Sequence, residues 1–347
     1  MSRRVFVVDD SAFVRRALTR ILDRATGYHV VGEEADAVEA LERIPALDPD
    51  LVTLDVAMPG MDGLQLLRAL LRWNPRLRVL MLSAHTRQGA AATVEALSAG
   101  AVDFIDKSSF NVMDLESLRR EVVEKMDACA RRATPPSGAR TRGALEPSAA
   151  AHCALCVIGA STGGPAALQR LLEPLAATFP LPIVVVQHMP VGFTRPFADR
   201  LRGLCRLDVS EAVEGERLAA GKVRIAPAGV HLRITGNLAL VLSADPAGAR
   251  HVPSIDLTMK SAERARPGRV LGILLTGMGE DGAEGMQAIR AGGGLTIAES
   301  EASCVVYGMP RAAWERGGAT ALLPLPEITG FLSRLTAAFP AASAAPR

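Results

Sequence analysis

Aromatic residues and lysines are scarce in this sequence, and each shortage narrows what the protein can bind. Phe, Trp and Tyr make up 4% of the 347 residues, which argues against recognition of nucleic-acid bases by aromatic stacking. Lysine occurs only four times, and 39 Lys and Arg residues are nearly balanced by 37 Asp and Glu residues, for a formal net charge of +2. This balance argues against a dedicated polyanion binder, and no basic stripe typical of a DNA-binding protein is visible. We therefore expect no nucleic-acid partner.

Disulfides, a secretion signal and membrane spans are also missing. Five cysteines, an odd number in a long chain, indicate no disulfide framework. Asp9 and Asp10 interrupt the first apolar run, so no secretory signal is visible. The longest uncharged stretches, 147–169 and 174–194, are broken by Pro, Gly, His and Gln, which is not typical of a membrane span. These features predict a cytoplasmic protein without membrane insertion.

The length and the charge distribution predict two domains, at roughly 150 residues per domain. Residues 1–127 carry 16 basic and 20 acidic residues, a net charge of −4. Residues 128–152 carry a net charge of +3 and are rich in Pro, Gly, Ser, Ala and Arg, which predicts a flexible linker. The second domain is expected over 153–337, and the Ala- and Pro-rich residues 338–347 are expected to be a disordered tail.

Both predicted domains show short apolar runs that alternate with helical patterns. The strand candidates are Val5–Val8, Leu51–Leu54, Val79–Leu82 and Val102–Ile105 in the first half and Ala154–Ile158, Ile183–Val186 and Val270–Leu275 in the second. This alternation predicts an α/β protein with two doubly wound parallel-sheet domains. In such sheets ligands bind beyond the carboxyl ends of the strands, so the residues that end the strands are the candidates for chemistry.

In the first half these strand-ending residues are mostly charged. Asp9, Asp10 and Asp55 follow or end predicted neighbouring strands, and three converging carboxylates would repel one another unless a cation neutralised them. All-oxygen ligation with room for water and a phosphoryl oxygen suits Mg²⁺. Lys107 and Ser83 also follow strand candidates and are suited to contact an added phosphoryl group. The alternative is that Asp9 and Asp10 are helix N-caps, which is the commoner role for either residue alone but not for the whole set.

With the segment DVAMPGMDG, which spans Asp55–Gly63, this part resembles the receiver domains of response regulators over nearly its whole length. The resemblance implies a flavodoxin-like fold in which Asp55 accepts a phosphoryl group from a histidine kinase. It also implies roles for the other residues: Asp9, Asp10 and Asp55 as Mg²⁺ ligands, Ser83 and Lys107 as phosphoryl sensors, and Phe104 as the aromatic switch residue. One departure is Ser108, because receivers usually have Pro after this Lys, often joined by a cis bond. A cis bond before a non-Pro residue costs about 2.5–4 kcal/mol, so we expect the 107–110 loop to follow a different path.

In the second half, a glycine-rich turn follows the first strand candidate. Gly159, Ser161 and Gly163 match the G-x-S-x-G spacing, in which flanking glycines allow a sharp turn that projects the hydroxyl. Backbone N–H groups from Thr162 to Gly164, near a helix start, are suited to stabilise an oxyanion. Taken alone, the turn is equally compatible with phosphate binding in a dinucleotide fold. The spacing is not G-x-G-x-x-G, however, and no Lys follows as in a P-loop.

Two further polar residues follow strand candidates of the same sheet. His188 ends the run that begins at Ile183, and Asp281 lies in the turn after Val270–Leu275. Ser161, His188 and Asp281 are therefore expected to meet at one edge as nucleophile, base and orienting carboxylate. Singly, such a His is more often structural and such an Asp more often an N-cap. The other histidines His152, His231 and His251 lack this context, and we assign them no role.

Four motifs, GASTGG, QHMP, TGMGEDG and SCVVYGMP, resemble in this order the catalytic domain of chemotaxis protein-glutamate methylesterases/protein-glutamine glutaminases over about 153–335. The resemblance implies a Rossmann-like domain that cleaves γ-glutamyl methyl esters on cytoplasmic helices of chemoreceptors and deamidates receptor glutamines. It implies that Ser161 attacks, His188 takes the proton, Asp281 holds His188, and backbone N–H groups of Thr162 and Met278 form the oxyanion hole. No cofactor is expected for ester hydrolysis. The competing hypothesis is a phosphorylation-regulated binding module without catalysis.

Overall fold

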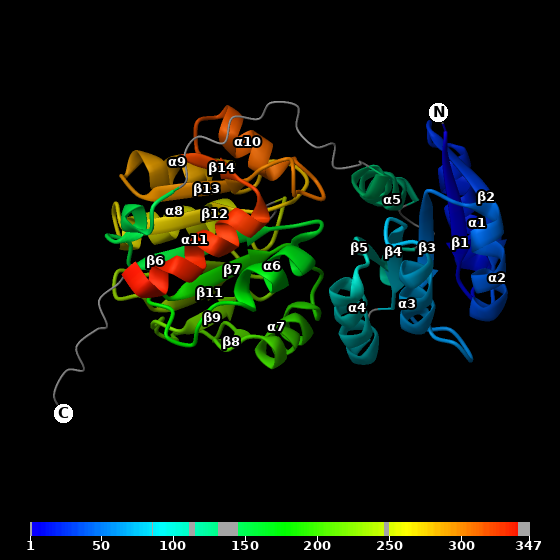
Figure 1. Cartoon of the computed structure of the whole chain (residues 1–347), viewed down its shortest axis with the longest axis horizontal. Coiled ribbons are helices and arrows are strands. Elements are labelled where there is room, and N and C mark those ends of the chain that lie inside the picture. The colour runs from blue at the N-terminus through cyan, green and yellow to red at the C-terminus, as the bar shows by residue number, and fades with distance from the viewer. Residues whose placement is uncertain (1, 85, 111–114, 131–144, 246–249, 339–347) are drawn as a thin grey trace. The chain divides into compact units, whose positions relative to one another are not determined.

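A computed structural model describes residues 2–84, 86–110, 115–130, 145–245 and 250–338 of the chain. These residues belong to two compact units, Met1–Arg132 and Ala133–Arg347, which are described separately (Figure 1). No helix in the described ranges is long and apolar enough to cross a bilayer.

The first unit contains a five-stranded parallel sheet in the order β2-β1-β3-β4-β5, which is the flavodoxin-like order. The strands are β1 Arg3–Val8, β2 Tyr28–Glu34, β3 Leu51–Asp55, β4 Arg78–Ser83 and β5 Asp103–Asp106. The helices are α1 Ala12–Asp23, α2 Ala37–Leu47, α3 Gly63–Trp73, α4 Arg87–Ala99 and α5 Leu115–Ala130. Contacts join α1 to α5, and α2 through α3 to α4, as two helical layers require. The predicted doubly wound fold of this half is confirmed.

The second unit contains a seven-stranded parallel sheet in the order β14-β13-β12-β6-β7-β9-β8. Its strands are β6 Leu155–Ala160, β7 Ile183–Gln187, β8 Asp208–Glu211, β9 Lys222–Ile225, β12 Val270–Leu274, β13 Leu295–Glu299 and β14 Ala321–Leu323. An antiparallel pair, β10 His231–Ile234 and β11 Leu240–Ser243, lies outside this sheet. The helices are α6 Gly164–Leu172, α7 Thr194–Leu204, α8 Ile255–Ala265, α9 Ala283–Ala291, α10 Met309–Glu315 and α11 Leu325–Ala338. The predicted parallel-sheet class is confirmed here too.

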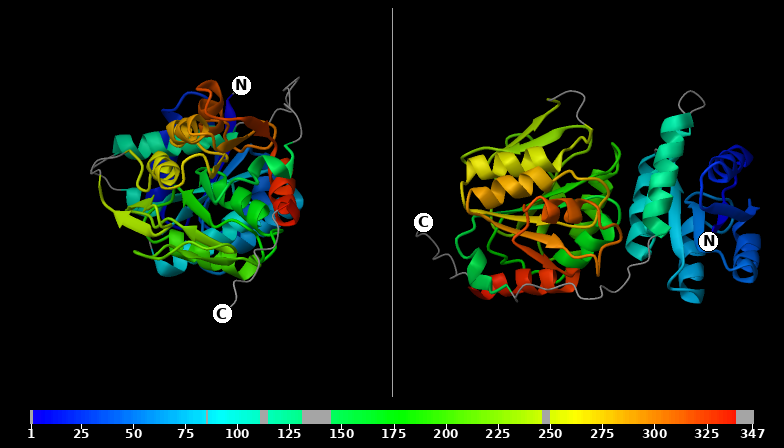
Figure 2. Two further views of the ribbon diagram at one scale, coloured as in Figure 1. Left: turned by 90° about the vertical axis from the view of Figure 1, so that its left-hand side faces the viewer. Right: turned by 90° about the horizontal axis from the view of Figure 1, so that it is seen from above.

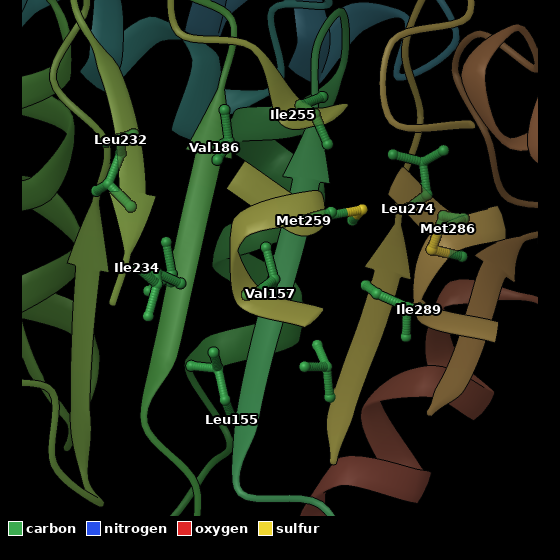
Figure 3. Close-up of a cluster of buried hydrophobic side chains, with 14 of the residues drawn as sticks. Leu155, Val157, Val186, Leu232, Ile234, Ile255, Met259, Leu274, Met286 and Ile289 are labelled. Atoms are coloured by element: carbon green, nitrogen blue, oxygen red, sulfur yellow. The ribbon is translucent and has the colours of Figure 1, made fainter. Parts of the chain in front are cut away.

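Helices cover both faces of this sheet, with α11 on one side and α8 and α9 on the other (Figure 2). The core under α8 and α9 consists of apolar side chains that are withdrawn from water. Figure 3 shows Met259 of α8 and Met286 of α9 against Val157 and Leu274 of the central strands, all fully buried. Because β6 and β12 are buried on both faces, they are continuous apolar runs rather than alternating ones.

The order of the strands places a topological switch point between β6 and β12. From β6 the chain proceeds to β7 on one side of the sheet, and later crosses to β12, β13 and β14 on the other. The loops that leave β6 and β12 therefore diverge at their carboxyl ends, and a crevice at such a point is where open α/β sheets bind ligands.

Two segments differ from the sequence-based expectation of a linker over 128–152. Helix α5 continues to Ala130, because Ala128 and Cys129 remain buried against the first sheet unit. Residues Pro147–Ala150 form a 3-10 turn (η2) that contacts α11, with Ala150 fully buried. The expected linker residues 131–144 and the expected tail residues 339–347 lie outside the described ranges.

The loop at Ser108 contains no cis peptide bond, since the one found in the described chain is Val252–Pro253. Lys107–Ser109 form a 3-10 turn instead. The backbone N–H of Ser108 donates a hydrogen bond of 2.9 Å to the Asp106 carboxylate, which caps the turn. A proline has no N–H and could not make this bond, so Ser at this position gives the loop its own capped conformation.

Candidate functional sites

Three carboxylates lie together at the carboxyl edge of the first sheet. Asp55 is the last residue of β3, and Asp9 and Asp10 follow β1, its neighbour in the sheet. One ligand oxygen from each lies within 4.8 Å of the others. Asp9 and Asp55 are buried, whereas Asp10 is exposed. Three clustered carboxylate oxygens, one of them open to solvent, are a donor set that fits Mg²⁺ with bound water.

Lys107 supplies the positive charge at this cluster. Its Nζ lies 2.8 Å from Oδ2 of Asp9 and 2.7 Å from Oδ2 of Asp55. Burial raises the pKa of Asp55 to about 6, although the hydrogen bond and charge of Lys107 oppose the shift. Burial likewise raises the pKa of Asp9. The two buried carboxylates thus share one cation, and a second cation would relieve their remaining repulsion.

The two residues expected to relay phosphorylation, Ser83 and Phe104, are both buried on neighbouring strands. Ser83 ends β4, and its Oγ accepts a 2.5 Å hydrogen bond from Oγ1 of Thr93 on α4. Phe104 lies on β5, with Nζ of Lys125 5.1 Å from the centre of its ring. The Ser83 hydroxyl is therefore engaged with α4 in this structure.

In the second unit, strand register places Ser161 and His188 at the starts of adjacent loops, although no hydrogen bond joins the Ser161 hydroxyl to the His188 ring among the described residues. Ala160 and Gln187, the last residues of β6 and β7, are paired, so the next residue on each strand begins an adjacent loop. The N–H of His188 donates to the carbonyl of Ala160 at 3.0 Å. The buried Gln187 side chain donates to the carbonyls of Ser161 at 2.9 Å and of His188 at 3.0 Å, so it holds the two loops together.

Asp281 reaches His188 from the loop after β12. Its Oδ2 lies 2.8 Å from Nε2 of the imidazole. The other ring nitrogen, Nδ1, is buried and has no hydrogen-bond partner among the described residues. Nε2 is thus the ring nitrogen that meets the carboxylate, and Nδ1 is the one left without a partner.

The start of α8 surrounds the Asp281 carboxylate with donors. Oδ1 accepts hydrogen bonds from the Ser254 hydroxyl at 3.1 Å and the Asp256 N–H at 3.0 Å, and Oδ2 accepts one from the Ile255 N–H at 2.8 Å. Burial by itself would raise the pKa of Asp281, but the hydrogen bond and charge of His188, with these N–H donors, hold it well below its usual range. Asp281 is therefore ionised at any physiological pH.

The predicted oxyanion donors, Thr162 and Met278, lie on two loops, and a third segment, residues 303–309, contacts both loops. Gly163 has φ +77°, and a Cβ there would lie 2.6 Å from Cβ of Val305. Gly277 exchanges hydrogen bonds with the same segment, donating to the carbonyl of Val306 at 3.0 Å. The backbone N–H groups of Thr162 and Met278 donate none of the hydrogen bonds found among the described residues.

His251, to which the sequence assigned no role, lies directly against the site. Its ring stacks on the His188 imidazole, with centroids 4.4 Å apart and planes 12° apart. Burial and then the charge of His188 lower the pKa of His251. His251 lies in the loop before α8 and not at the end of a strand, so the pattern that marks the other site residues does not mark it.

Comparisons with known proteins agree with this division of the chain. Residues 156–332 match the family model described as CheB methylesterase, and residues 5–118 match that of the response regulator receiver domain. The chain is 41% identical over 358 residues to protein-glutamate methylesterase/protein-glutamine glutaminase 1 of Oleidesulfovibrio alaskensis, covering 94% of this chain and 97% of that protein. It is 43% identical over 337 residues to the protein of the same description from Archaeoglobus fulgidus, covering 94% and 95%.

A solved structure is also similar to the second unit. The crystal structure of the CheB methylesterase catalytic domain of Thermotoga maritima superimposes with a TM-score of 0.51 at 39% sequence identity. The match covers 53% of this chain and 98% of that domain.

Proposed function

The chain belongs to the CheB methylesterase family, and from that premise we propose that it is a protein-glutamate methylesterase and protein-glutamine glutaminase controlled by phosphorylation of its receiver domain. Its substrates are γ-glutamyl methyl esters and glutamine side chains on cytoplasmic helices of methyl-accepting chemoreceptors, where it acts in the cytoplasm to adjust sensory adaptation. The observation that carries the proposal is the His188–Asp281 hydrogen bond beside the turn that presents Ser161.

Ser161, His188 and Asp281 perform the hydrolysis in two stages. The Ser161 hydroxyl attacks the ester carbonyl while Nδ1 of His188 takes its proton, and Asp281 stabilises the imidazolium through Nε2. The tetrahedral intermediate then expels methanol, which leaves with the proton from His188, and an acyl-enzyme remains. A water molecule, deprotonated by His188, attacks the acyl carbon; the bond to Oγ of Ser161 then breaks, His188 returns the proton to Oγ, and the receptor glutamate side chain is released as a carboxylate. With a glutamine substrate the same steps release ammonia.

The backbone N–H groups of Thr162 and Met278 stabilise the oxyanion of each tetrahedral intermediate. Both lie at the switch point between β6 and β12, and neither donates another hydrogen bond among the described residues. Donors that are already oriented need no reorganisation when negative charge develops, and one such donor is typically worth about 10²–10³-fold in kcat.

In the receiver domain, Asp55 accepts the phosphoryl group from a phosphohistidine of a chemotaxis-type histidine kinase, as a mixed anhydride. Asp9, Asp10 and Asp55 would hold Mg²⁺, which neutralises charge on the phosphoryl oxygens when bound. Lys107, already paired with Asp55, contacts the added group. The Ser83 hydroxyl turns from Thr93 toward the phosphoryl group. The ring of Phe104, on the neighbouring strand β5, then changes its position.

The experiment is methanol release from purified methylated chemoreceptors, with and without a small phosphodonor and Mg²⁺. We expect turnover that the phosphodonor increases, and Ser161→Ala is expected to lose turnover while still accepting the phosphoryl group. No methanol release by the parent protein would favour a phosphorylation-regulated binding module instead.

A second comparison tests the mode of control. If the unphosphorylated receiver restrains the catalytic domain, a fragment of residues 145–347 is expected to release methanol faster than the unphosphorylated full-length chain. This fragment keeps η2, which packs on α11. A fragment slower than the unphosphorylated full-length protein would rule out restraint by the receiver.

A further inference from the structure

A buried carboxylate that the reaction does not use lies behind the active site. Glu299 is the last residue of β13 and is fully buried. Its Oε2 accepts the Thr276 N–H at 2.8 Å, and its Oε1 accepts the Ser303 hydroxyl at 2.8 Å. Burial raises the pKa of Glu299, while the hydrogen bonds from Thr276 and Ser303 oppose the shift.

Thr276 connects Glu299 to the turn that carries Ser161. Its carbonyl accepts the Ser161 N–H at 3.0 Å. Its hydroxyl donates to the Thr162 carbonyl at 2.9 Å and accepts the Val306 N–H at 2.9 Å. Displacement of Thr276 would therefore move the Ser161–Thr162 peptide and, two residues further along the chain, Met278.

Ser303 connects Glu299 to residues 303–309, the segment that contacts both oxyanion loops. Its hydroxyl also accepts the Leu325 N–H at 2.8 Å, which fixes the start of the segment. Further along, the Gly277 carbonyl accepts the N–H groups of Gly308 and Met309 at 3.2 and 2.9 Å. The residues just before Met278 are thus held from two sides, by Thr276, which donates to Glu299, and by the segment that begins at Ser303, which also donates to Glu299.

We propose that Glu299 is a positioning residue that sets the oxyanion-hole geometry by orienting Thr276 and Ser303, a role that rests on the methylesterase function proposed above. The buried Thr276 N–H and the half-buried Ser303 hydroxyl each need an acceptor, and the one carboxylate supplies both. An apolar side chain of similar size fills the space but leaves both donors unpaired, so the two loops relax. The variant should therefore stabilise the transition state less, because donors aimed at the developing oxyanion act mainly there.

The test compares Glu299→Leu, Glu299→Gln and Glu299→Asp in the full-length chain. Glu299→Leu is expected to lower kcat for methanol release about 10–100-fold and to leave KM within about 3-fold, because it displaces the oxyanion donors without removing either, and loss of one donor costs about 10²–10³-fold. Glu299→Gln keeps an acceptor for the Thr276 N–H and is expected to stay within about 5-fold of the parent, because its amide can donate to Ser303. Glu299→Asp keeps the carboxylate on a side chain that is one methylene shorter and so reaches Thr276 and Ser303 less well. Its kcat is therefore expected to lie below that of Glu299→Gln.

Thr296→Val is the matched control, because Thr296 is also buried on β13 but hydrogen-bonds to Thr320, away from the oxyanion loops. A drop in kcat for Glu299→Leu no larger than that for Thr296→Val overturns the proposal, as does a change confined to KM. If Glu299→Leu does not fold, equal kcat for the Gln and Asp variants overturns it. Covalent labelling of Ser161 by a fluorophosphonate should slow in parallel with kcat. This readout needs no receptor substrate, so it separates failure of the Glu299 role from failure of the proposed function.

Discussion

Asp55 and Asp281 are both buried at the carboxyl edge of a parallel sheet, yet the protein shifts their pKa values in opposite directions. Asp55 accepts one long backbone hydrogen bond, from Ala57 at 3.3 Å, and shares Lys107 with its acidic neighbour Asp9. Asp281 has His188 and three donors from the start of α8. The donors around a buried carboxylate, rather than its place on a strand, thus decide whether its pKa rises or falls.

The difference suits the two proposed roles. A carboxylate that orients an imidazole has to remain ionised throughout the cycle, which a dense set of donors ensures. A carboxylate that accepts a phosphoryl group has to keep an oxygen available, so it cannot be enclosed by donors in the same way. The repulsion this leaves in the receiver is what a bound cation would relieve.

The largest expected effect that tests this comparison comes from Asp281→Asn. The variant keeps the shape but not the charge, and we expect kcat for methanol release to fall by about 10³–10⁴-fold, as loss of an orienting carboxylate does in other triads. Phosphoryl uptake by Asp55, measured with a radiolabelled phosphodonor, should not change. An Asp281→Asn enzyme that keeps more than a tenth of the parental kcat would show that the carboxylate does not orient His188.

Mg²⁺ is expected to stabilise the receiver domain and not the catalytic domain. At about 100 times its dissociation constant, a ligand specific for the folded state adds about 2.7 kcal/mol to the free energy of unfolding. Calorimetry with MgCl₂ and then EDTA measures this shift, and Asp10→Asn, which removes the exposed carboxylate, should diminish it. An equal shift in the isolated 145–347 fragment would contradict the assignment of the metal site to the receiver.

Asp55→Asn is expected to stabilise the receiver domain in the absence of Mg²⁺, by about 1–3 kcal/mol at pH 8. The folded-state pKa of Asp55 is raised to about 6 from an unfolded value of 3.8, so ionisation opposes folding. This cost develops as pH rises from about 4 to about 6 and is fully present above that range. Unfolding in urea at pH 8 and at pH 4 checks the sign, since the gain should disappear at pH 4. A destabilised variant at pH 8 would mean that the ion pair with Lys107 outweighs burial.

The smallest effect is expected from Ser254→Ala, which removes one donor to Asp281 and the N-cap hydrogen bond to Leu257 of α8. The loss in stability should be about 1 kcal/mol at pH 7. Because the pKa of Asp281 is depressed in the folded state, its stabilising contribution is present above about pH 4 and is lost as the pH falls. The deficit of Ser254→Ala should therefore shrink in acid unfolding experiments, whereas a deficit independent of pH would reflect the lost cap alone.

Much of the site could be predicted because strand ends are visible in a sequence. Asp55, Ser83, Ser161 and His188 each end or follow an apolar run, and parallel strands place such residues at one edge of their sheet. The family motifs then supplied roles for these residues, which the proposed experiments test. The two Ala-rich ends of the predicted linker 128–152 belong instead to α5 and η2, in which Ala128, Cys129 and Ala150 are buried.

Several residues that contact the site are not marked by any pattern in the sequence. His251 stacks on His188 from an irregular loop, and Thr93 engages Ser83 from the buried side of a helix. Glu299 ends a strand, but nothing in its surroundings marks its partners Thr276 and Ser303, which lie 23 residues before it and four after it. Such contacts depend on side-chain directions and loop paths, which periodicity does not encode.

The amino-acid sequence alone determined the alternation of strands and helices, the division into two parallel sheets and the residues at the strand ends, because apolar spacing and turn residues are local properties of the chain. Tertiary structure alone decided which nitrogen of His188 meets Asp281, how many donors surround each buried carboxylate, and which residues hold the oxyanion loops. These depend on register between strands and on the packing of α8 and β13 against the edge of the sheet. The direction of each pKa shift follows from that packing, because a buried carboxylate responds to the few donors within hydrogen-bonding distance and not to its place in the chain.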